Sequence, residues 1–337
     1  MRFTAVIVLI ICLSVTEGLM AQTNAIDWVR VTEHAQWAAR DSQGEVVHDG
    51  RMWLFGGWFT SNAIGPRDVW ASSDGINWEE VTHEAGWKAG DIPTSITFDG
   101  RMWMMGGWYA GRLPEGCGSN AVWASENGAD WECLTENAAW TPRLGAAGVV
   151  HNDRMWLIGG MEQYFFGDED DLCNDVWSSV DGMEWTLETN DAPWAPRAYH
   201  NVLSFNGKLW LFGGGNYLPE YIGYNDVWSS EDGINWTQVT ENAPWPGRIW
   251  FSAAVYRGCM WLLGGWSNDP SRNWNDVWYS ADGATWHELQ TPTIWSERHE
   301  HSAYVHGGKL WVVAGNEWPL VNDVWYLELP EDWTPQQ

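Results

Sequence analysis

The sequence predicts an all-β fold, a six-bladed β-propeller with four antiparallel strands in each blade. One observation is a repeat, because the tryptophan that opens a Trp-x-x-Arg segment recurs at intervals of 50, 53, 54, 51 and 50 residues. Another is that every repeat contains short apolar runs separated by Gly-containing turns. Radially packed sheets repeat their sequence at such a constant interval, whereas a β-sandwich has no reason to do so. The six tryptophans that open the repeats are Trp37, Trp87, Trp140, Trp194, Trp245 and Trp295.

The fourth unit shows how each repeat supplies its strands. Its residues 200–205, an Asn-Gly turn and residues 208–212 predict a β-hairpin. After a Gly pair and a variable loop, residues 226–230 and 235–240 predict two further strands around an Asp-Gly turn. We expect one domain over residues 22–337, with units at about 33–82, 83–135, 136–189, 190–240, 241–290 and 291–333.

Closure of the ring needs a strand from the N-terminal end of the chain. Residues 27–32 have the form of a fourth strand, yet they precede the first complete unit, so we expect them to complete the last blade. Residues 332–335 compete for that position. Pro335 argues against them, because proline has no backbone N–H to donate within a sheet.

These motifs resemble the kelch repeat over nearly the whole chain. The shared features are the Gly-Gly pair after the second strand, the Asp-x-Trp of the third, the Trp of the fourth and the Arg ahead of the first. The chain departs from the family pattern at Ala314-Gly315, which replaces one Gly pair. The resemblance implies a propeller that binds partners through the loops on one face.

The first 21 residues predict export. Residues 1–21 combine a basic start, a short apolar run and a small residue for cleavage, which is typical of a signal peptide and too short for a membrane span. We therefore expect a secreted or periplasmic protein without a membrane span, and a monomer. The net charge of -28 disfavours nucleic acid and anionic membrane surfaces as partners. Of the pairings open to the four later cysteines, we expect a Cys117–Cys173 disulfide first.

Surplus aromatic residues indicate one binding face. The repeat accounts for all but six of the 31 tryptophans, and these six lie in loops after the Gly pair or just after Trp-x-x-Arg. Such residues either roof the blades or form a stacking surface for a sugar, an aromatic group or a cation. The surplus tryptophans are Trp58, Trp108, Trp250, Trp266, Trp274 and Trp318, and the loops add Tyr109, Tyr164, Phe165, Phe166, Tyr217 and Tyr221.

Charged residues at the start of each inner strand complete the candidate ligand-binding set. Arginine recurs in five of the six units, with Gly90 in the second. Its repetition favours a scaffold role, and the alternative is a ring of cations at the channel mouth that holds a carboxylate. The arginines are Arg40, Arg143, Arg197, Arg248 and Arg298, and the less repetitive residues that follow them are Asp41, Asp91, Tyr199, Trp250, His299 and Glu300.

No cofactor is expected from the sequence. His299 and His301 would point to the same side of a strand and could supply two metal ligands, but His301 occupies the position of His200 in another unit, which favours a structural role. The acidic run at 168–171 lacks the ligand spacing of a calcium loop. A galactose oxidase-like copper site would need seven blades and a cysteine beside a tyrosine. This sequence predicts six blades and places no cysteine beside such a tyrosine, so we do not expect that copper site.

The function predicted from these residues is a binding module. Its partner would be a glycan or an extracytoplasmic protein, held by the aromatic face. The alternative is a carbohydrate-active enzyme similar to the sialic acid mutarotases, in which an arginine holds the substrate carboxylate and a neighbouring acid moves a proton. The pairs that could act in this way are Arg298 with Glu300 and Arg40 with Asp41.

Overall fold

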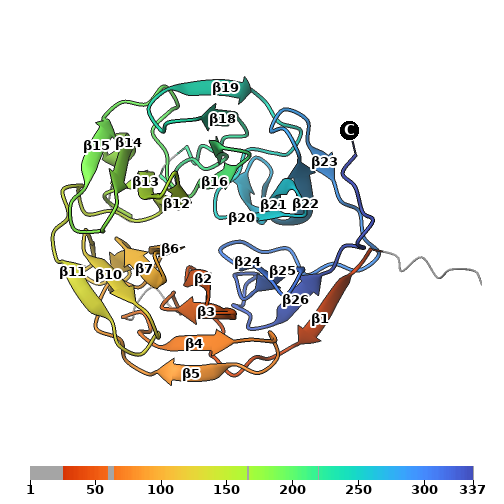
Figure 1. Ribbon diagram of the computed structural model, residues 1–337, viewed down its shortest axis with the longest axis horizontal. Helices are drawn as coiled ribbons and strands as arrows, with labels where there is room; N and C mark the ends of the chain where they lie inside the picture. The colour runs from red at the N-terminus through yellow and green to blue at the C-terminus, as the bar shows by residue number, and fades with distance from the viewer. Residues whose placement is uncertain (1–25, 60–63, 165–166, 219, 337) are drawn as a thin grey trace, which may run out of the picture.

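Six four-stranded antiparallel sheets are arranged around a central channel in the computed structural model (Figure 1). The structure describes residues 26–59, 64–164, 167–218 and 220–336. The predicted signal peptide, Phe165 and Phe166 lie outside these residues. The sheets confirm the all-β, six-bladed fold. No helix within the described ranges has the length and apolar character needed to cross a membrane.

Each blade runs outward from the channel in chain order. The first contains β2 (Gly44–His48), β3 (Arg51–Phe55), β4 (Val69–Ser72) and β5 (Glu79–Thr82), and the second contains β6 (Thr94–Phe98), β7 (Arg101–Met105), β10 (Val122–Ser125) and β11 (Glu132–Thr135). The third contains β12 (Ala147–His151), β13 (Arg154–Met161), β14 (Leu172–Ser179) and β15 (Thr186–Thr189), and the fourth contains β16 (Asn201–Phe205), β17 (Lys208–Phe212), β18 (Val227–Ser230) and β19 (Trp236–Thr240). The fifth contains β20 (Ser252–Tyr256), β21 (Cys259–Asn268), β22 (Ser271–Ser280) and β23 (His287–Glu288).

The last blade joins the two ends of the chain. It contains β24 (Ser302–His306), β25 (Lys309–Val313), β26 (Val324–Leu327) and the N-terminal strand β1 (Trp28–Thr32). β1 pairs antiparallel with β26, with Trp28 opposite Leu327. The predicted closure by the N-terminal strand is confirmed (Figure 1).

Two short elements lie outside the blades. β8 (Trp108–Tyr109) and β9 (Cys117–Gly118) form a small hairpin in the second unit, and a 3₁₀ turn spans Glu169–Asp171. The four cysteines of the described residues are free, so the expected Cys117–Cys173 disulfide is wrong. Cys117 is exposed in the small hairpin, whereas Cys173 is partly buried beside Glu162.

Paired indole rings hold the blades together. In each unit the tryptophan of Trp-x-x-Arg meets the tryptophan at the start of a fourth strand edge to face, with ring centroids 4.6 to 6.2 Å apart and planes at 80 to 89°. This geometry brings the positive edge of one ring to the negative face of the other. In the last blade the pair is Trp28 with Trp295, so an indole of β1 completes the pattern.

The five repeated arginines are buried inside the scaffold. In the fourth unit Nη1 and Nη2 of Arg197 donate to the two carboxylate oxygens of Asp226 at 2.6 and 2.9 Å, and Nη1 also donates to the carbonyl of Gly213 at 2.9 Å. The second unit has Gly90 in place of the arginine and Ala121 in place of the aspartate, so both partners are missing together. The other pairs are Arg40–Asp68, Arg143–Asp175, Arg248–Asp276 and Arg298–Asp323.

The residues that stand two positions after the arginine position of each unit form a ring of backbone hydrogen bonds around the channel. These residues adopt positive φ, and five of the six N–H groups in the described chain donate to the equivalent carbonyl of the preceding blade, at 2.8 to 3.4 Å. The ring lies between a pocket at the channel mouth and a second chamber along the inner strands. Its members are Ser42, Ile92, Gly145, Tyr199, Trp250 and Glu300.

Candidate functional site

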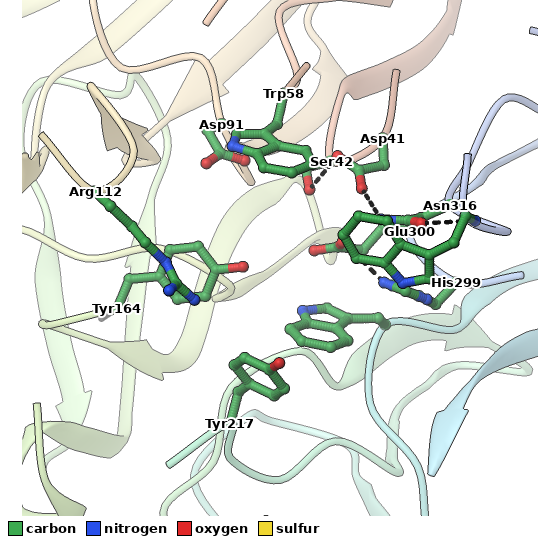
Figure 2. A pocket seen from close by; sticks show the side chains of 12 residues that line it. Asp41, Ser42, Trp58, Asp91, Arg112, Tyr164, Tyr217, His299, Glu300 and Asn316 are labelled. Atoms are coloured by element: carbon green, nitrogen blue, oxygen red, sulfur yellow. Dashed lines mark hydrogen bonds and ion pairs between the residues drawn. The ribbon is translucent and has the colours of Figure 1, made fainter. Parts of the chain in front are cut away.

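A pocket of about 260 Å³ lies at the mouth of the channel, on the face that carries the loops between the second and third strands (Figure 2). Two sets of residues build it. One set follows the arginine position of the first, second, fifth and sixth units, and the other lies in the loops after the Gly pairs, so the repeat itself brings them together. The lining residues are Asp41, Ser42, Trp58, Asp91, Arg112, Tyr164, Tyr217, Trp250, His299, Glu300, Asn316 and Trp318.

Nine of the twelve lining residues were among those predicted from the sequence. The two sets meet because the residue after each arginine position forms a β-bridge with the residue after the Gly pair of its own unit, as Asp41 does with Trp58 and His299 with Asn316. The third and fourth units have Leu144 and Ala198 at these positions. The polar groups therefore gather on the side of the first, second and sixth blades.

Aromatic side chains form the opposite wall. Trp250 lies at its centre, with its ring centroid 5.0 Å from that of His299 and 4.6 Å from that of Tyr217. Trp250 is almost fully buried, whereas Trp318 at the rim has 71% of its surface exposed. The pocket thus combines a fixed aromatic wall with a solvent-exposed indole that can meet a ligand from outside.

Three carboxyl groups lie at the base of the pocket. Oδ2 of Asp41 accepts a hydrogen bond from Nδ2 of Asn316 at 2.8 Å. Burial raises the pKa of Asp41 to about 7. Burial, together with the negative charge of Asp41, raises the pKa of Asp91 and of Glu300 well above their ordinary values.

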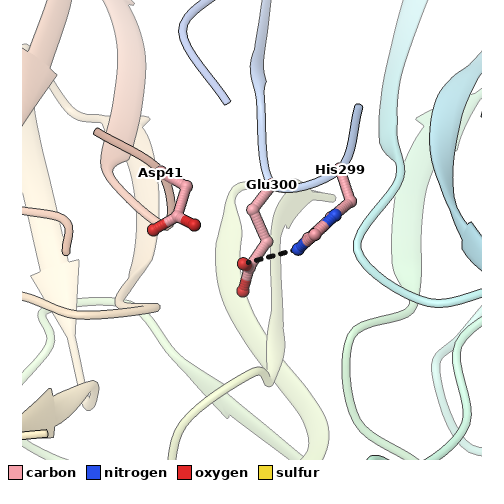
Figure 3. Close-up of side chains that lie close together, drawn as sticks. All are labelled: Asp41, His299 and Glu300. Atoms are coloured by element: carbon pink, nitrogen blue, oxygen red, sulfur yellow. Dashed lines mark ion pairs between the residues drawn. The ribbon is translucent and has the colours of Figure 1, made fainter. Parts of the chain in front are cut away.

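His299 lies beside these carboxyl groups as a neutral ring. Its Nδ1 is 2.7 Å from Oδ1 of Asn273, and its Nε2 is 3.5 Å from Oε2 of Glu300 (Figure 3). Burial lowers the pKa of His299 to about 3. One possible ligand atom from each of Asp41, His299 and Glu300 lies within 4.8 Å of the others, which is the spacing of a metal-binding group.

Several predicted residues lie outside the pocket. Trp108 is buried in the small hairpin, where its Nε1 donates to the carbonyl of Gly111 at 2.8 Å, and Tyr109 follows it in β8. Tyr199 and Trp266 pack behind the aromatic wall, with ring centroids 5.2 and 6.0 Å from that of Trp250. The arginines Arg40, Arg143, Arg197, Arg248 and Arg298 face scaffold aspartates.

The buried arginines also bear on the enzyme alternative. Arg298 and Arg40 each have no exposed side-chain surface and bind Asp323 and Asp68 with both terminal nitrogens. Neither can hold a substrate carboxylate without leaving its partner unpaired. The two pairs considered for a mutarotase-like reaction therefore do not form in this geometry.

Three lining residues were missed in the sequence: Ser42, Arg112 and Asn316. Asn316 follows the Ala-Gly pair at the position held by Trp58, Trp108 and Trp266 in other units, so a comparison of the repeats could have identified it. Ser42 stands at the positive-φ position of its unit, which the sequence alone does not mark. Arg112 lies in a loop without a counterpart in the other units.

A second chamber of about 140 Å³ continues along the channel below the backbone ring. Glu45 on β2 faces it and accepts a hydrogen bond from Oγ of Ser302 at 3.2 Å. Burial raises the pKa of Glu45 to about 8. His200 and His301, which also line this chamber, have pKa values lowered chiefly by burial.

Comparisons with known proteins agree with the fold. Residues 164–336, half of the chain, match a family model described as the KLHDC2/KLHL20/DRC7 Kelch-repeats domain. The chain is 31% identical over 135 residues to the dynein alpha chain of the flagellar outer arm of Chlamydomonas reinhardtii, and 28% identical over 150 residues to alpha-scruin of Limulus polyphemus. These matches cover 37% and 40% of this chain, but 3% and 15% of those proteins. The chain therefore spans only a small part of either relative.

Proposed function

The chain belongs to the kelch-repeat β-propeller family, and from that premise we propose that it is a binding module which holds a projecting group of another protein in the pocket at the channel mouth. Kelch propellers are typical protein-interaction modules. The observation that carries the proposal is the convergence of aromatic and polar groups on one face, with Trp318 exposed at the rim. The opposite face consists of short turns between strands.

The pocket suits a single side chain or chain end of a partner. Its volume of about 260 Å³ accommodates a group of that size, and the Trp250 wall supplies a flat apolar surface. Trp318 at the rim would lose exposed apolar surface when the partner docks, as central aromatic residues do at interfaces. The net charge of -28 favours encounter with neutral or basic partners.

A glycan is the second candidate partner. An exposed indole such as Trp318 stacks on the apolar face of a sugar ring, and the carboxyl groups of Asp41 and Asp91 can accept hydrogen bonds from sugar hydroxyls. If residues 1–21 act as a signal peptide, either partner would be extracytoplasmic. A monomeric propeller is sufficient for both.

Binding to identified partners tests the proposal. Candidates would be found with a glycan array and by affinity capture from the extracytoplasmic fraction, and the Kd of each purified partner would then be measured. Trp318→Ala and Tyr217→Ala should each weaken binding by about 10-fold or more, as truncation of a central aromatic contact does. Ile234→Ala is the matched control, because Ile234 is exposed in a turn at the other end of its blade.

The opposite pattern would refute the proposal. If Ile234→Ala abolished binding while Trp318→Ala and Tyr217→Ala left it unchanged, the partner would dock on the face away from the pocket. A glycan that binds with the same dependence on Trp318 would favour the second candidate over a protein partner.

A further inference from the structure

We propose that Asp41, His299 and Glu300 form a binding site for a divalent transition-metal ion at the base of the pocket. Their candidate ligand atoms lie within 4.8 Å of one another, and Figure 3 shows the side chains converging from the first and sixth blades. Two carboxylates and one imidazole are a ligand set for Zn²⁺ and similar ions. The site goes beyond the proposed function, because an ion could bind there with or without a partner.

The hydrogen bonds around His299 fix which of its nitrogens is free. Nδ2 of Asn273 donates to the carbonyl of Asn316 at 3.0 Å, so Oδ1 of Asn273 is the atom that faces Nδ1 of His299. Nδ1 therefore carries the proton and Nε2 keeps its lone pair. A histidine that binds a metal through one nitrogen usually donates the other N–H to an oxygen in this way.

The free lone pair points at a second acceptor. Nε2 of His299 lies 3.5 Å from Oε2 of Glu300, which is too long for a hydrogen bond between them. Two acceptor atoms at this separation leave room for a cation that binds both. A metal ion at usual Zn–N and Zn–O distances of about 2 Å fits between such atoms.

Asp41 is oriented by a similar supporting bond. Oδ1 of Asn316 accepts from the backbone N–H of Trp318 at 3.2 Å, so Nδ2 of Asn316 is the group that donates to Oδ2 of Asp41 at 2.8 Å. This bond fixes the carboxylate and leaves lone pairs on both of its oxygens. Asp41 and His299, two of the three ligands, are thus oriented by hydrogen bonds from the surrounding chain.

Asp91 is a further buried polar group that faces the same pocket. It lines the same pocket with only 4% of its surface exposed, and neither of its carboxylate oxygens has a hydrogen-bond partner among the described residues. Oε1 of Glu300 is also buried without a hydrogen-bond partner among the described residues. A bound cation would offset the desolvation of these groups in their ionised form. Arg112 lies across the pocket from His299 in Figure 2.

An ion held by three protein ligands would keep an open position. The Asp41, His299 and Glu300 side chains approach from one side, and the other side is the pocket. A water molecule or a donor atom of the partner would complete the coordination. The ion would also favour the ionised form of the carboxyl groups around it.

Calorimetric titration of the chelator-treated full chain with ZnCl₂ tests the site. We expect one equivalent of Zn²⁺ to bind saturably, and Co²⁺ to give the visible absorption bands of a protein-bound ion. His299→Ala should weaken Zn²⁺ binding by at least about 10-fold. Asn273→Leu leaves the ligands in place but removes the orienting acceptor, and should weaken binding by about 10- to 100-fold.

Two controls make the result specific. His83→Ala removes a histidine from an exposed His–Glu pair and should leave the titration unchanged, which separates the site from adventitious surface binding. Thermal melting without metal checks that each variant is folded, and Asn273→Leu remains informative if His299→Ala is not. The proposal would be overturned by the absence of saturable Zn²⁺ uptake, by Zn²⁺ binding in both His299→Ala and Asn273→Leu as tight as in the unmodified chain, or by equal affinity of the unmodified chain for Ca²⁺. Failure here would leave the Trp318 binding test unaffected.

Discussion

Removing Asp226 should destabilise the propeller far more than its partial exposure suggests. Asp226 accepts hydrogen bonds from both terminal nitrogens of Arg197 and from Nε1 of Trp228. The Arg197 side chain has no exposed surface and lies over the ring of Tyr224 at 4.2 Å. Asp226→Ala therefore leaves a buried guanidinium without its counter-charge.

The expected loss in the free energy of unfolding is about 3–5 kcal/mol, the cost of leaving one member of a buried ion pair alone. At about 2 °C for each kcal/mol, as for larger domains, the melting temperature should fall by about 6–10 °C. The double variant Arg197→Met/Asp226→Ala should recover part of this loss, because it removes the unpaired charge as well. The second blade has no charge at the equivalent positions, Gly90 and Ala121, which supports this expectation.

Denaturation by urea, followed by tryptophan fluorescence, measures the effect in all variants. Glu231→Ala is the matched control in the same blade, since Glu231 forms a pair with Lys208 at 3.5 Å in which the side chains are 78% and 41% exposed. Such a pair contributes about 0–1 kcal/mol. The reasoning would be refuted if Asp226→Ala cost no more than Glu231→Ala, or if the double variant Arg197→Met/Asp226→Ala were no more stable than Asp226→Ala.

Two further predictions concern the channel. The pKa of Glu45 is about 8 in the folded chain against an ordinary 4.5, so the free energy of unfolding should fall as pH rises from about 5 to 8, by at most about 5 kcal/mol. Glu45→Gln should flatten this slope in urea denaturation measured at several pH values. An equal slope in both proteins would contradict this. In Gly145→Ala the new Cβ would lie 2.8 Å from Cδ1 of Tyr199 at a φ of 62°, so we expect a loss of about 2–3 kcal/mol. Gly207→Ala, with φ of 73° and open space, should cost only about 1 kcal/mol, and equal losses would show that Tyr199 imposes no constraint.

The fold could be predicted because the structural tryptophans occupy the same place in every repeat. Their edge-to-face pairs recur because each member of a pair repeats at the interval near 50 residues that the sequence displays. The sequence also indicates the partner of the repeated arginine, since Gly90 replaces the arginine and Ala121 replaces the aspartate in the same unit. The structure shows the pairing directly.

The site was only partly predictable because its contacts join distant parts of the chain. Asp41 and Glu300 stand at equivalent positions of the first and sixth units, so the repeat places them around one axis. Asn273 lies on β22, in a hairpin extension of the fifth blade, and reaches His299 of the next unit. No repeat pattern indicates this contact, because among the described strands only β21 and β22 of the fifth unit extend that far.

Because β1 pairs with β26, the propeller ring can close only after both ends of the chain have been synthesised. The first strand of the wheel is made early, but its hydrogen-bonding partner follows almost 300 residues later. Until then β1 has no sheet to join, and the sixth blade lacks its outer edge. The propeller can therefore be completed only when nearly the whole polypeptide has been made. A chain that ends before β26 cannot form the β1–β26 pairing that joins its two ends.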